Sequence, residues 1–199
     1  MKKINVYDFD KTIYQKDCSV EFWRFCLSKN KSLIFILPYQ VLMFSLNKLG
    51  MISIEKCKEE FFSFLKVLKR NEIENLVLKF WEKEIKNLNK ELKEIILKSE
   101  LENICISASP EFLLKIPCEK LKINLVIGTK YNMDTYEIEG KNCKGKEKIE
   151  RLNLEKGNYA IENFYSDSLS DLPLFKIAKN KFILKNSKIQ KLKLEDKRC

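Results

Sequence analysis

The sequence DFDKT at residues 8–12 constrains this chain more than any other stretch. It follows a short run at residues 3–7 that predicts a buried strand. Two carboxylates placed two residues apart at the end of such a strand lose hydration, which is costly unless they bind a cation or take part in chemistry. We therefore interpret Asp8 as a candidate nucleophile and Asp10 as a candidate proton donor and acceptor.

The chain contains no histidine, and this excludes several kinds of site. Ser-His-Asp and Cys-His catalysis, phosphohistidine intermediates and His-ligated metals all need that residue. The seven cysteines include no C-x-x-C pair, so the sequence lacks the usual spacing of a zinc site. An odd number of cysteines without a signal peptide predicts reduced thiols and a cytoplasmic protein.

Lysine and arginine exceed aspartate and glutamate by 38 to 28, which gives a formal net charge of +10. The lysines are scattered along the predicted helices, and no basic stretch is interleaved with aromatic residues. This pattern predicts a solvated, lysine-rich surface and no nucleic-acid partner.

Residues 33–44 are strongly apolar but contain Pro38 and Gln40. The segment falls short of the ~20 apolar residues that a membrane-spanning helix needs. We expect a buried helix here, and contact of this helix with a partner or a membrane surface is the alternative.

Helical periodicity dominates the chain from residue 14 to residue 88. Nine of the 13 phenylalanines and both tryptophans precede residue 82. Aromatic residues on that many helical faces predict a small core of their own. We therefore assign residues 14–88 to an all-helical cap subdomain inserted after the first strand.

From residue 103 onward, short apolar strands alternate with helices. The predicted strands cover residues 104–106, 123–127, 160–165 and 182–184. This alternation predicts an α/β protein with a Rossmann-like parallel sheet, built from residues 1–13 and 89–199. Ligands of such sheets bind beyond the carboxyl ends of the strands, so the polar residues that follow these strands should meet in one crevice.

Polar residues follow two of the later strands. Ser107 ends the second predicted strand, and Ser109 is predicted to cap a helix whose first residue is Pro110. The amides of Ala108 and Ser109 would then face an anion at the positive end of the helix dipole. The sequence SDSLSD at residues 166–171 follows a third strand and supplies two further acids.

These motifs resemble, in the same order, those of haloacid dehalogenase-superfamily phosphatases. DFDKT resembles the D-x-D-x-T signature, Ser107 the second motif, a lysine at the head of a later helix the third, and SDSLSD the acidic fourth. The helical insertion after the first motif is most similar to the phosphoserine-phosphatase-like branch. The resemblance implies phosphomonoester hydrolysis in which Asp8 forms an aspartyl-phosphate and Asp10 serves as general acid and base.

The same resemblance implies a magnesium ion. Its ligands would be the Asp8 carboxylate, the backbone carbonyl of Asp10 and Asp167, with Asp171 acting directly or through water. Acids at strand ends without a nearby histidine favour magnesium over zinc or iron.

The resemblance also implies a set of residues that bind the substrate phosphate. They are Thr12, Ser107, Ala108 and Lys148 or Lys146. Lys144 is a third candidate for the lysine. Lys148 is preferred, because Ile149 and Leu152 then continue the helix at the family's usual offsets.

The resemblance does not extend to the recognition of phosphoserine. Asp17 falls near an acidic residue of that branch, but Phe61 occupies the position of its cap arginine. Neither Arg24 nor Arg70, the two arginines of the predicted cap, matches that position. We therefore expect a small-molecule phosphomonoester other than phosphoserine as substrate.

Two alternatives use the same fold. A membrane-surface phosphatase would act on a phospholipid head group and dock through residues 33–44 and the basic C-terminal tail. A non-catalytic phosphate-binding protein would be favoured if an acid of the site were missing, and none is.

Overall fold

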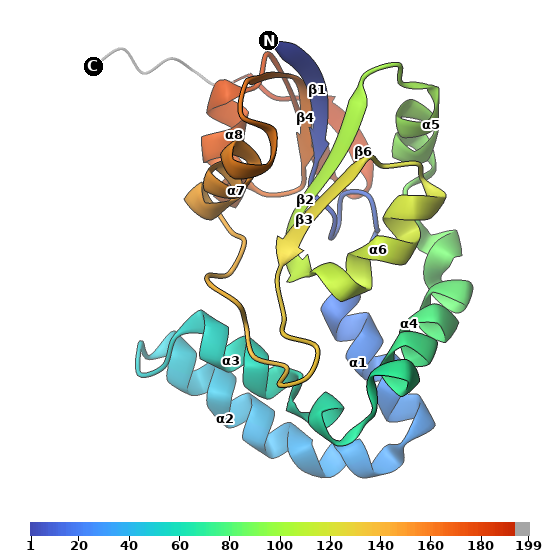
Figure 1. Cartoon of the computed structure of the whole chain (residues 1–199), viewed down its shortest axis with the longest axis vertical. Helices are drawn as coiled ribbons and strands as arrows, with labels where there is room; N and C mark the ends of the chain where they lie inside the picture. Colours follow the sequence, from blue (N-terminus) through green and yellow to red (C-terminus); the bar gives the residue numbers. More distant parts are fainter. Residues whose placement is uncertain (194–199) are drawn as a thin grey trace.

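The described part of the chain contains one six-stranded sheet with the strand order β3-β2-β1-β4-β5-β6 (Figure 1). The computed structural model describes residues 1–193, so Cys199 and most of the basic tail lie outside the described residues. Strands β1 to β5 are parallel to their neighbours, and β6 is antiparallel to β5. The strands are β1 (Lys2–Tyr7), β2 (Glu102–Pro110), β3 (Leu125–Thr129), β4 (Tyr159–Ser166), β5 (Asn180–Lys185) and β6 (Lys188–Lys191). The predicted α/β class with a mostly parallel sheet is confirmed.

Helices cover both faces of the sheet (Figure 1). The helices on one face are α5 (Lys90–Lys98) and α6 (Glu111–Lys120), and those on the other are α7 (Lys146–Lys156) and α8 (Leu172–Ile177). The alternation of side chains along β1 explains the two layers. Ile4 and Val6 belong to the buried cluster of α7 and α8, whereas Tyr7 belongs to the cluster of α5 and α6.

The strands are aligned so that their carboxyl ends share one edge. Tyr7 of β1 is paired with Cys105 of β2 and with Tyr165 of β4. The residues that follow these three positions therefore emerge at the same edge. This register brings the first acid motif, the serine motif and the second acid motif together.

The chain between β1 and α5 is helical apart from its turns (Figure 1). Its elements are α1 (Cys18–Lys29), η1 (Lys31–Ile36), α2 (Leu37–Lys48), α3 (Ile54–Phe61), η2 (Ser63–Val67), α4 (Arg70–Glu84) and η3 (Ile85–Asn87), where η denotes a 3₁₀ helix. This helical segment does not have the separate core that we expected. Trp81 of α4 donates its indole N–H to the carbonyl of Leu113 on α6 at 2.7 Å, and Phe22 of α1 packs against Phe112 of α6. One buried cluster joins the segment to the sheet, because the aromatic sides of α1 and α4 meet α6. The division at residues 14–88 stays a prediction.

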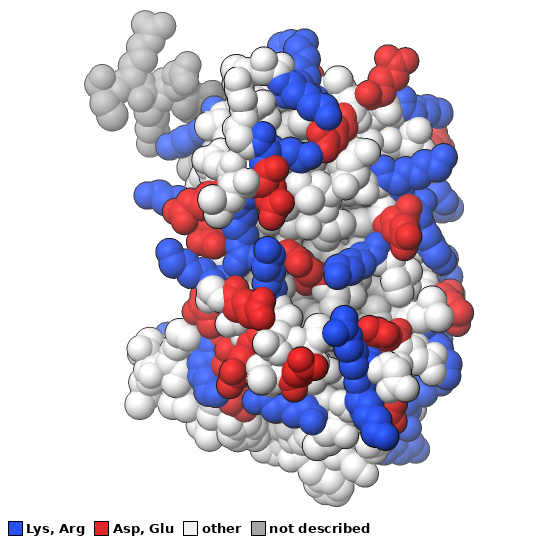
Figure 2. Space-filling model, in the orientation of Figure 1, with Lys and Arg blue, Asp and Glu red and all other residues white. Residues whose placement is uncertain are grey.

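The expectation that residues 33–44 are buried is wrong. Gln40 is the only buried residue of α2, and η1 contains none. Helix α2 packs on α3 along one side, and its opposite side is exposed. Figure 2 shows few charges at the lower margin of the molecule, where Figure 1 places α2. Within residues 1–193, no helix is long and apolar enough to cross a membrane.

Strand β6 was not expected from the sequence. It forms a hairpin with β5, in which Leu184 is paired with Ile189. The two turn residues, Asn186 and Ser187, have φ values of 50° and 63°. Positive φ at both positions is typical of a tight hairpin turn. Asn-Ser is a weaker signal for that turn than Asn-Gly, which explains why the pattern did not reveal the strand.

Candidate active site

The polar strand ends line one cleft at the carboxyl edge of the sheet. The cleft has a volume of about 230 Å³ and also receives side chains from α3 and from the loop before α7. The predicted site residues that line it are Asp8, Asp10, Ser107, Ala108, Lys148, Asp167 and Asp171. Lys144 lines it as well, whereas Thr12 and Lys146 are not among its lining residues.

Lys148 joins two of the acids. Its ammonium nitrogen lies 2.8 Å from Asp8 Oδ1 and 2.8 Å from Asp171 Oδ2. Lys148 is 2% exposed, on the side of α7 that also buries Leu152. Lys146 lies two residues earlier and is exposed. Of the three candidate lysines, Lys148 is therefore the one that contacts the predicted nucleophile.

Burial sets the electrostatics of this cluster. Loss of hydration raises the pKa of Asp8 to about 7, and the charges of Asp171 and Asp10 act in the same direction, whereas Lys148 lowers it. Burial alone lowers the pKa of Lys148, but the two neighbouring carboxylates outweigh it, so the pKa is raised. Lys148 therefore stays protonated and favours the ionised form of Asp8, which a nucleophile requires.

Two donors hold the carboxylate of Asp10. The backbone N–H of Cys18, at the start of α1, donates to Oδ1 at 2.7 Å, and the hydroxyl of Ser109 donates to Oδ2. Burial raises the pKa of Asp10 to about 6, and the charge of Asp17 adds to this, whereas the two donors lower it. A carboxyl group with a pKa near neutrality can both give and take a proton.

The expected role of Ser109 as a helix cap is wrong. Helix α6 begins at Glu111 and has no side-chain cap. The Ser109 hydroxyl binds Asp10 instead, and the Ser109 amide donates to Ser107 Oγ at 3.1 Å. The pairing of β2 with β3 is irregular over residues 106–110, so the chain leaves the sheet ladder at the cleft. A motif that looks like a cap in the sequence thus positions the predicted proton donor.

Thr12 connects the first acid motif to the fourth. It is buried, and its hydroxyl accepts a hydrogen bond from the backbone N–H of Asp167 at 2.9 Å. Burial raises the pKa of Asp167, while the charge of Lys11 lowers it. Thr12 therefore fixes the loop that carries Asp167, and its predicted phosphate contact stays a prediction.

The helical segment supplies a cation that sequence reasoning missed. Lys58 of α3 lines the cleft, and its ammonium donates to the Ala108 carbonyl at 2.8 Å and to Asn142 Oδ1 at 2.7 Å. Burial lowers the pKa of Lys58, while the charges of Asp10 and Asp17 raise it. Among 38 lysines and arginines, no pattern distinguishes Lys58 from the solvated ones. Its contacts join the helical segment to β2 and to the loop before α7.

The donors of the cleft suit magnesium by their chemistry. Within the described residues, Asp171 Oδ1 is buried without a hydrogen-bond partner, and such an oxygen is suited to a bound water or cation. The acids offer oxygen ligands, which magnesium prefers together with retained waters. Among residues 1–193, no group of three or more Asp, Glu, Cys or His side chains is assembled closely enough to hold a metal ion.

The arginines of the helical segment do not line the cleft. Arg24 forms an exposed ion pair with Glu21, and Arg70 forms one with Glu74. Phe61 packs among the aromatic rings of Trp23 on α1, Phe44 on α2 and the neighbouring Phe62. The positions considered for phosphoserine recognition therefore have other contacts.

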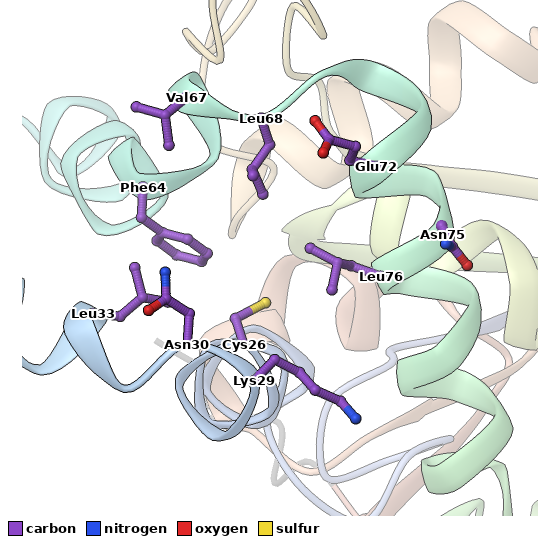
Figure 3. A pocket seen from close by; sticks show the side chains of 10 residues that line it. All are labelled: Cys26, Lys29, Asn30, Leu33, Phe64, Val67, Leu68, Glu72, Asn75 and Leu76. Atoms are coloured by element: carbon purple, nitrogen blue, oxygen red, sulfur yellow. The ribbon is translucent and has the colours of Figure 1, made fainter.

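A second cavity, of about 350 Å³, lies in the helical segment between α1, η1, η2 and α4 (Figure 3). Phe64, Leu68 and Leu76 point into it, while the ammonium of Lys29 points away. None of the motif residues lines this cavity. The predicted phosphate chemistry therefore belongs to the cleft at the strand ends.

The family model of haloacid dehalogenase-like hydrolases matches residues 6–176 of the chain. This range includes all four motifs of the cleft. Among curated proteins, no sequence matches the chain.

Solved structures share the fold at low sequence identity. A protein of unknown function from Bordetella pertussis Tohama I has a TM-score of 0.78 and 18% identity, over 91% of this chain and 89% of that chain. A phosphoserine phosphohydrolase-like protein from Francisella tularensis subsp. tularensis SCHU S4 has a TM-score of 0.58 and 20% identity, over 91% and 86%. A phospho-aspartyl intermediate analogue of phosphoserine phosphatase has a TM-score of 0.54 and 19% identity, over 90% and 85%. At such identities the similarity shows a shared fold.

Proposed function

Because the chain belongs to the haloacid dehalogenase-like hydrolases, we propose that it is a phosphatase that hydrolyses phosphomonoesters through an aspartyl-phosphate on Asp8. The observation that carries the proposal is the 2.8 Å contact between the Lys148 ammonium and Asp8, in a cleft that also contains Asp10. The buried cation favours the ionised form of Asp8, which lies at the end of a strand with its oxygen nucleophile exposed to the cleft.

In the first step, Asp8 attacks the phosphorus of the ester. Lys148 binds Oδ1, which leaves Oδ2 to form the new bond, and the bond between phosphorus and the ester oxygen breaks. Asp10 gives its proton to the departing oxygen, so that an alcohol leaves instead of an alkoxide. Cys18 and Ser109 hold Asp10 in place for this transfer. The products are the alcohol and a phosphorylated Asp8.

In the second step, water hydrolyses the phosphorylated Asp8. Asp10 is now ionised and takes a proton from the water as its oxygen attacks the phosphorus. The bond between phosphorus and Asp8 breaks, which restores the carboxylate and releases inorganic phosphate. The pKa of about 6 at Asp10 supports both roles in turn.

We include a magnesium ion in the proposal. Asp8, Asp167 and the backbone carbonyl of Asp10 would bind it, and the unpaired Oδ1 of Asp171 would contact one of its waters. When bound, the ion supplies positive charge that offsets the phosphate and the carboxylates.

We propose a small phosphomonoester other than phosphoserine as the substrate. Four lysines that can bind the phosphate line the cleft of about 230 Å³: Lys11, Lys58, Lys144 and Lys148. Five aspartates line it as well, and the proposed magnesium ion would offset part of their charge. None of the described lining residues is an arginine, which would offer the paired donors that suit an amino-acid carboxylate.

Hydrolysis of p-nitrophenyl phosphate, with and without Mg²⁺, tests this proposal. Asp8→Asn is nearly isosteric and removes the nucleophile, so kcat should fall at least about 10³-fold, or ~4 kcal/mol. Asp134→Asn, at an exposed position in the loop before α7, is the matched control and should keep the activity. Acid-quenched wild type should carry one phosphoryl group that neutral hydroxylamine removes, and Asp8→Asn should carry none. Full activity of Asp8→Asn would refute the nucleophile, and activity unaffected by chelation would refute the metal.

A further inference from the structure

The outward side of η1 and α2 carries many exposed apolar side chains. Phe35 is 83% exposed and Leu49 is 74% exposed. We call this surface the η1–α2 face, and its exposed residues are Ile34, Phe35, Leu37, Val41, Leu42, Phe44 and Leu49. On α2, Leu37, Val41 and Phe44 are spaced by four and three residues along one flank, and Leu42 lies further round the helix.

Helix α2 leaves several apolar side chains exposed, although its Met43 and Leu46 are half-buried. The one buried residue of α2 is Gln40, whose amide donates to the carbonyl of Phe61 on α3 at 2.9 Å. A surface helix of a globular protein usually turns its apolar stripe inward and its polar side outward. An exposed apolar surface of this kind is typical of a site that binds a partner or a membrane.

The contacts with α3 fix the direction in which this face points. Besides the Gln40 hydrogen bond, the rings of Phe44 and Phe61 lie 5.8 Å apart in an edge-to-face arrangement. Asn47 donates to the carbonyl of Ile52 at 3.0 Å, which closes the turn between α2 and α3. The η1–α2 face is therefore a formed surface of the fold.

The charges around the face are all positive in the sequence. No Asp or Glu occurs between Glu21 and Glu55, and Lys29, Lys31 and Lys48 flank the apolar residues. Lys31 and Lys48 are exposed. Figure 2 shows the corresponding margin of the molecule as mostly uncharged.

The acids of the neighbouring helix α3 already have partners. Glu55 accepts a hydrogen bond from the backbone of Asn142, Glu59 accepts one from Ile138, and Glu60 pairs with Lys56. These three acids are therefore engaged within the fold.

This arrangement distinguishes between two occupants of the face. If a second copy packed on it around a two-fold axis, the same patch would meet itself, and the like-charged lysines would be brought together around the contact. Anionic lipid head groups would instead pair with the lysines while the apolar side chains enter the boundary between head groups and acyl chains. The charge pattern favours the lipid surface.

We propose that the η1–α2 face docks the protein on the surface of an anionic lipid bilayer, with α2 lying in the plane of the membrane. Phe35, Val41 and Leu42 enter the acyl boundary, and Lys31 and Lys48 contact the head groups. Helix α3 lies between this face and the cleft, because Phe61 contacts α2 whereas Lys58 lines the cleft. The proposed docking face is therefore separate from the cleft of the proposed phosphatase activity.

Co-sedimentation with large unilamellar vesicles tests the proposal. The wild type should pellet with vesicles of phosphatidylglycerol and phosphatidylcholine, and binding should be weak with phosphatidylcholine alone and decrease with added salt. The double variant Phe35→Ser/Leu42→Ser should bind at least about tenfold more weakly, since both side chains leave water on docking. Leu154→Ser, at a leucine of α7 that is 85% exposed, is the matched control and should bind like the wild type.

Phe35 and Leu42 are both exposed, so the double variant should keep the circular dichroism spectrum and the free energy of unfolding of the wild type. These two measurements show whether it is folded. The proposal is overturned if the wild type stays in the supernatant or binds neutral and anionic vesicles equally. It is also overturned if the double variant binds like the wild type. A dimer in solution that the double variant abolishes would assign the face to a second copy. Equally tight binding of a monomeric short-chain phospholipid would assign lipid binding to the cavity of Figure 3.

Discussion

Replacement of Lys148 by methionine removes the one charge that two buried carboxylates share. The side chains of Lys148 and Asp171 are each 3% exposed, and that of Asp8 is 11% exposed. Methionine keeps the length of the lysine stem, so the apolar packing of α7 is largely retained. The change in stability is therefore mainly electrostatic.

The size of the effect follows from the burial of the partners. Removal of one member of a buried ion pair costs about 3–5 kcal/mol, because the other charge remains buried without compensation. Here two carboxylates lose the same partner, and one of them is expected to take up a proton in response. We therefore expect the free energy of unfolding to fall by about 4 kcal/mol at neutral pH.

The loss of stability caused by Lys148→Met should increase with pH. Burial already raises the pKa of Asp8 to about 7, and Lys148 is the group that lowers it, so Lys148→Met raises it further. A carboxyl group whose pKa is higher in the folded than in the unfolded state destabilises the fold above its unfolded pKa. The deficit of the variant should therefore be smaller at about pH 5 than at about pH 9.

Urea unfolding in the presence of a chelator, followed by circular dichroism, measures these effects. A loss of about 4 kcal/mol lowers the urea midpoint by about 2 M at an m-value of about 2 kcal/mol/M. The exposed lysine of α5 provides the control, since Lys93→Met should change stability by less than about 0.5 kcal/mol. Lys148→Met/Asp171→Asn should be more stable than Lys148→Met alone, because it buries one carboxylate fewer. A loss below about 1 kcal/mol, or one that is the same at both pH values, would refute the reasoning.

Three further predictions concern the proton donor and the attachment of the helical segment. Asp10→Asn should lower kcat/KM about 10²–10⁴-fold for an alkyl phosphate. The loss should be smaller for p-nitrophenyl phosphate, because its leaving group needs no proton. Equal losses for the two substrates would contradict the general-acid role. Ser109→Ala removes a donor that lowers the pKa of Asp10, so the alkaline limb of the kcat/KM profile should move to higher pH; an unchanged limb would show that Ser109 does not act on Asp10. Trp81→Phe leaves the carbonyl of Leu113 without its donor, so the free energy of unfolding measured with urea should fall by about 1–3 kcal/mol. A change below ~0.5 kcal/mol would show that this buried hydrogen bond adds little.

The order of the elements as far as β5, and the place of the site, could be predicted from the sequence alone. Alternating apolar runs and helical patterns predict a parallel sheet, because each pattern has its own period. In such a sheet the carboxyl ends of the strands share one edge, so Asp8, Ser107 and Asp167 could be placed together without coordinates. The preference for Lys148 came from the family resemblance, and α7 agrees with it, since Leu152 lies one turn later on the same buried side.

Contacts between distant segments could not be predicted in this way. Ser109 looks like a helix cap, and only the bulge in β2 turns its hydroxyl toward Asp10. Lys58 is one of many lysines, and only the packing of α3 beside β2 brings it to the carbonyl of Ala108. Each of these two contacts joins residues that are 50 or more positions apart in the sequence. Local periodicity carries no information about such pairs.

Local sequence patterns also left open the environment of Asp8 and Asp10 and the burial of α2. The sequence identifies Asp8 and Asp10 as costly carboxylates, but only the tertiary structure gives each its donors and its own pKa. The sequence likewise shows that residues 33–44 are apolar, and burial is the expectation for such a segment. The structure contradicts this expectation. Gln40 of α2 hydrogen-bonds to α3, and nothing in the described chain covers the opposite side of α2. Composition therefore determined that the helix is apolar, and packing left much of its apolar surface exposed.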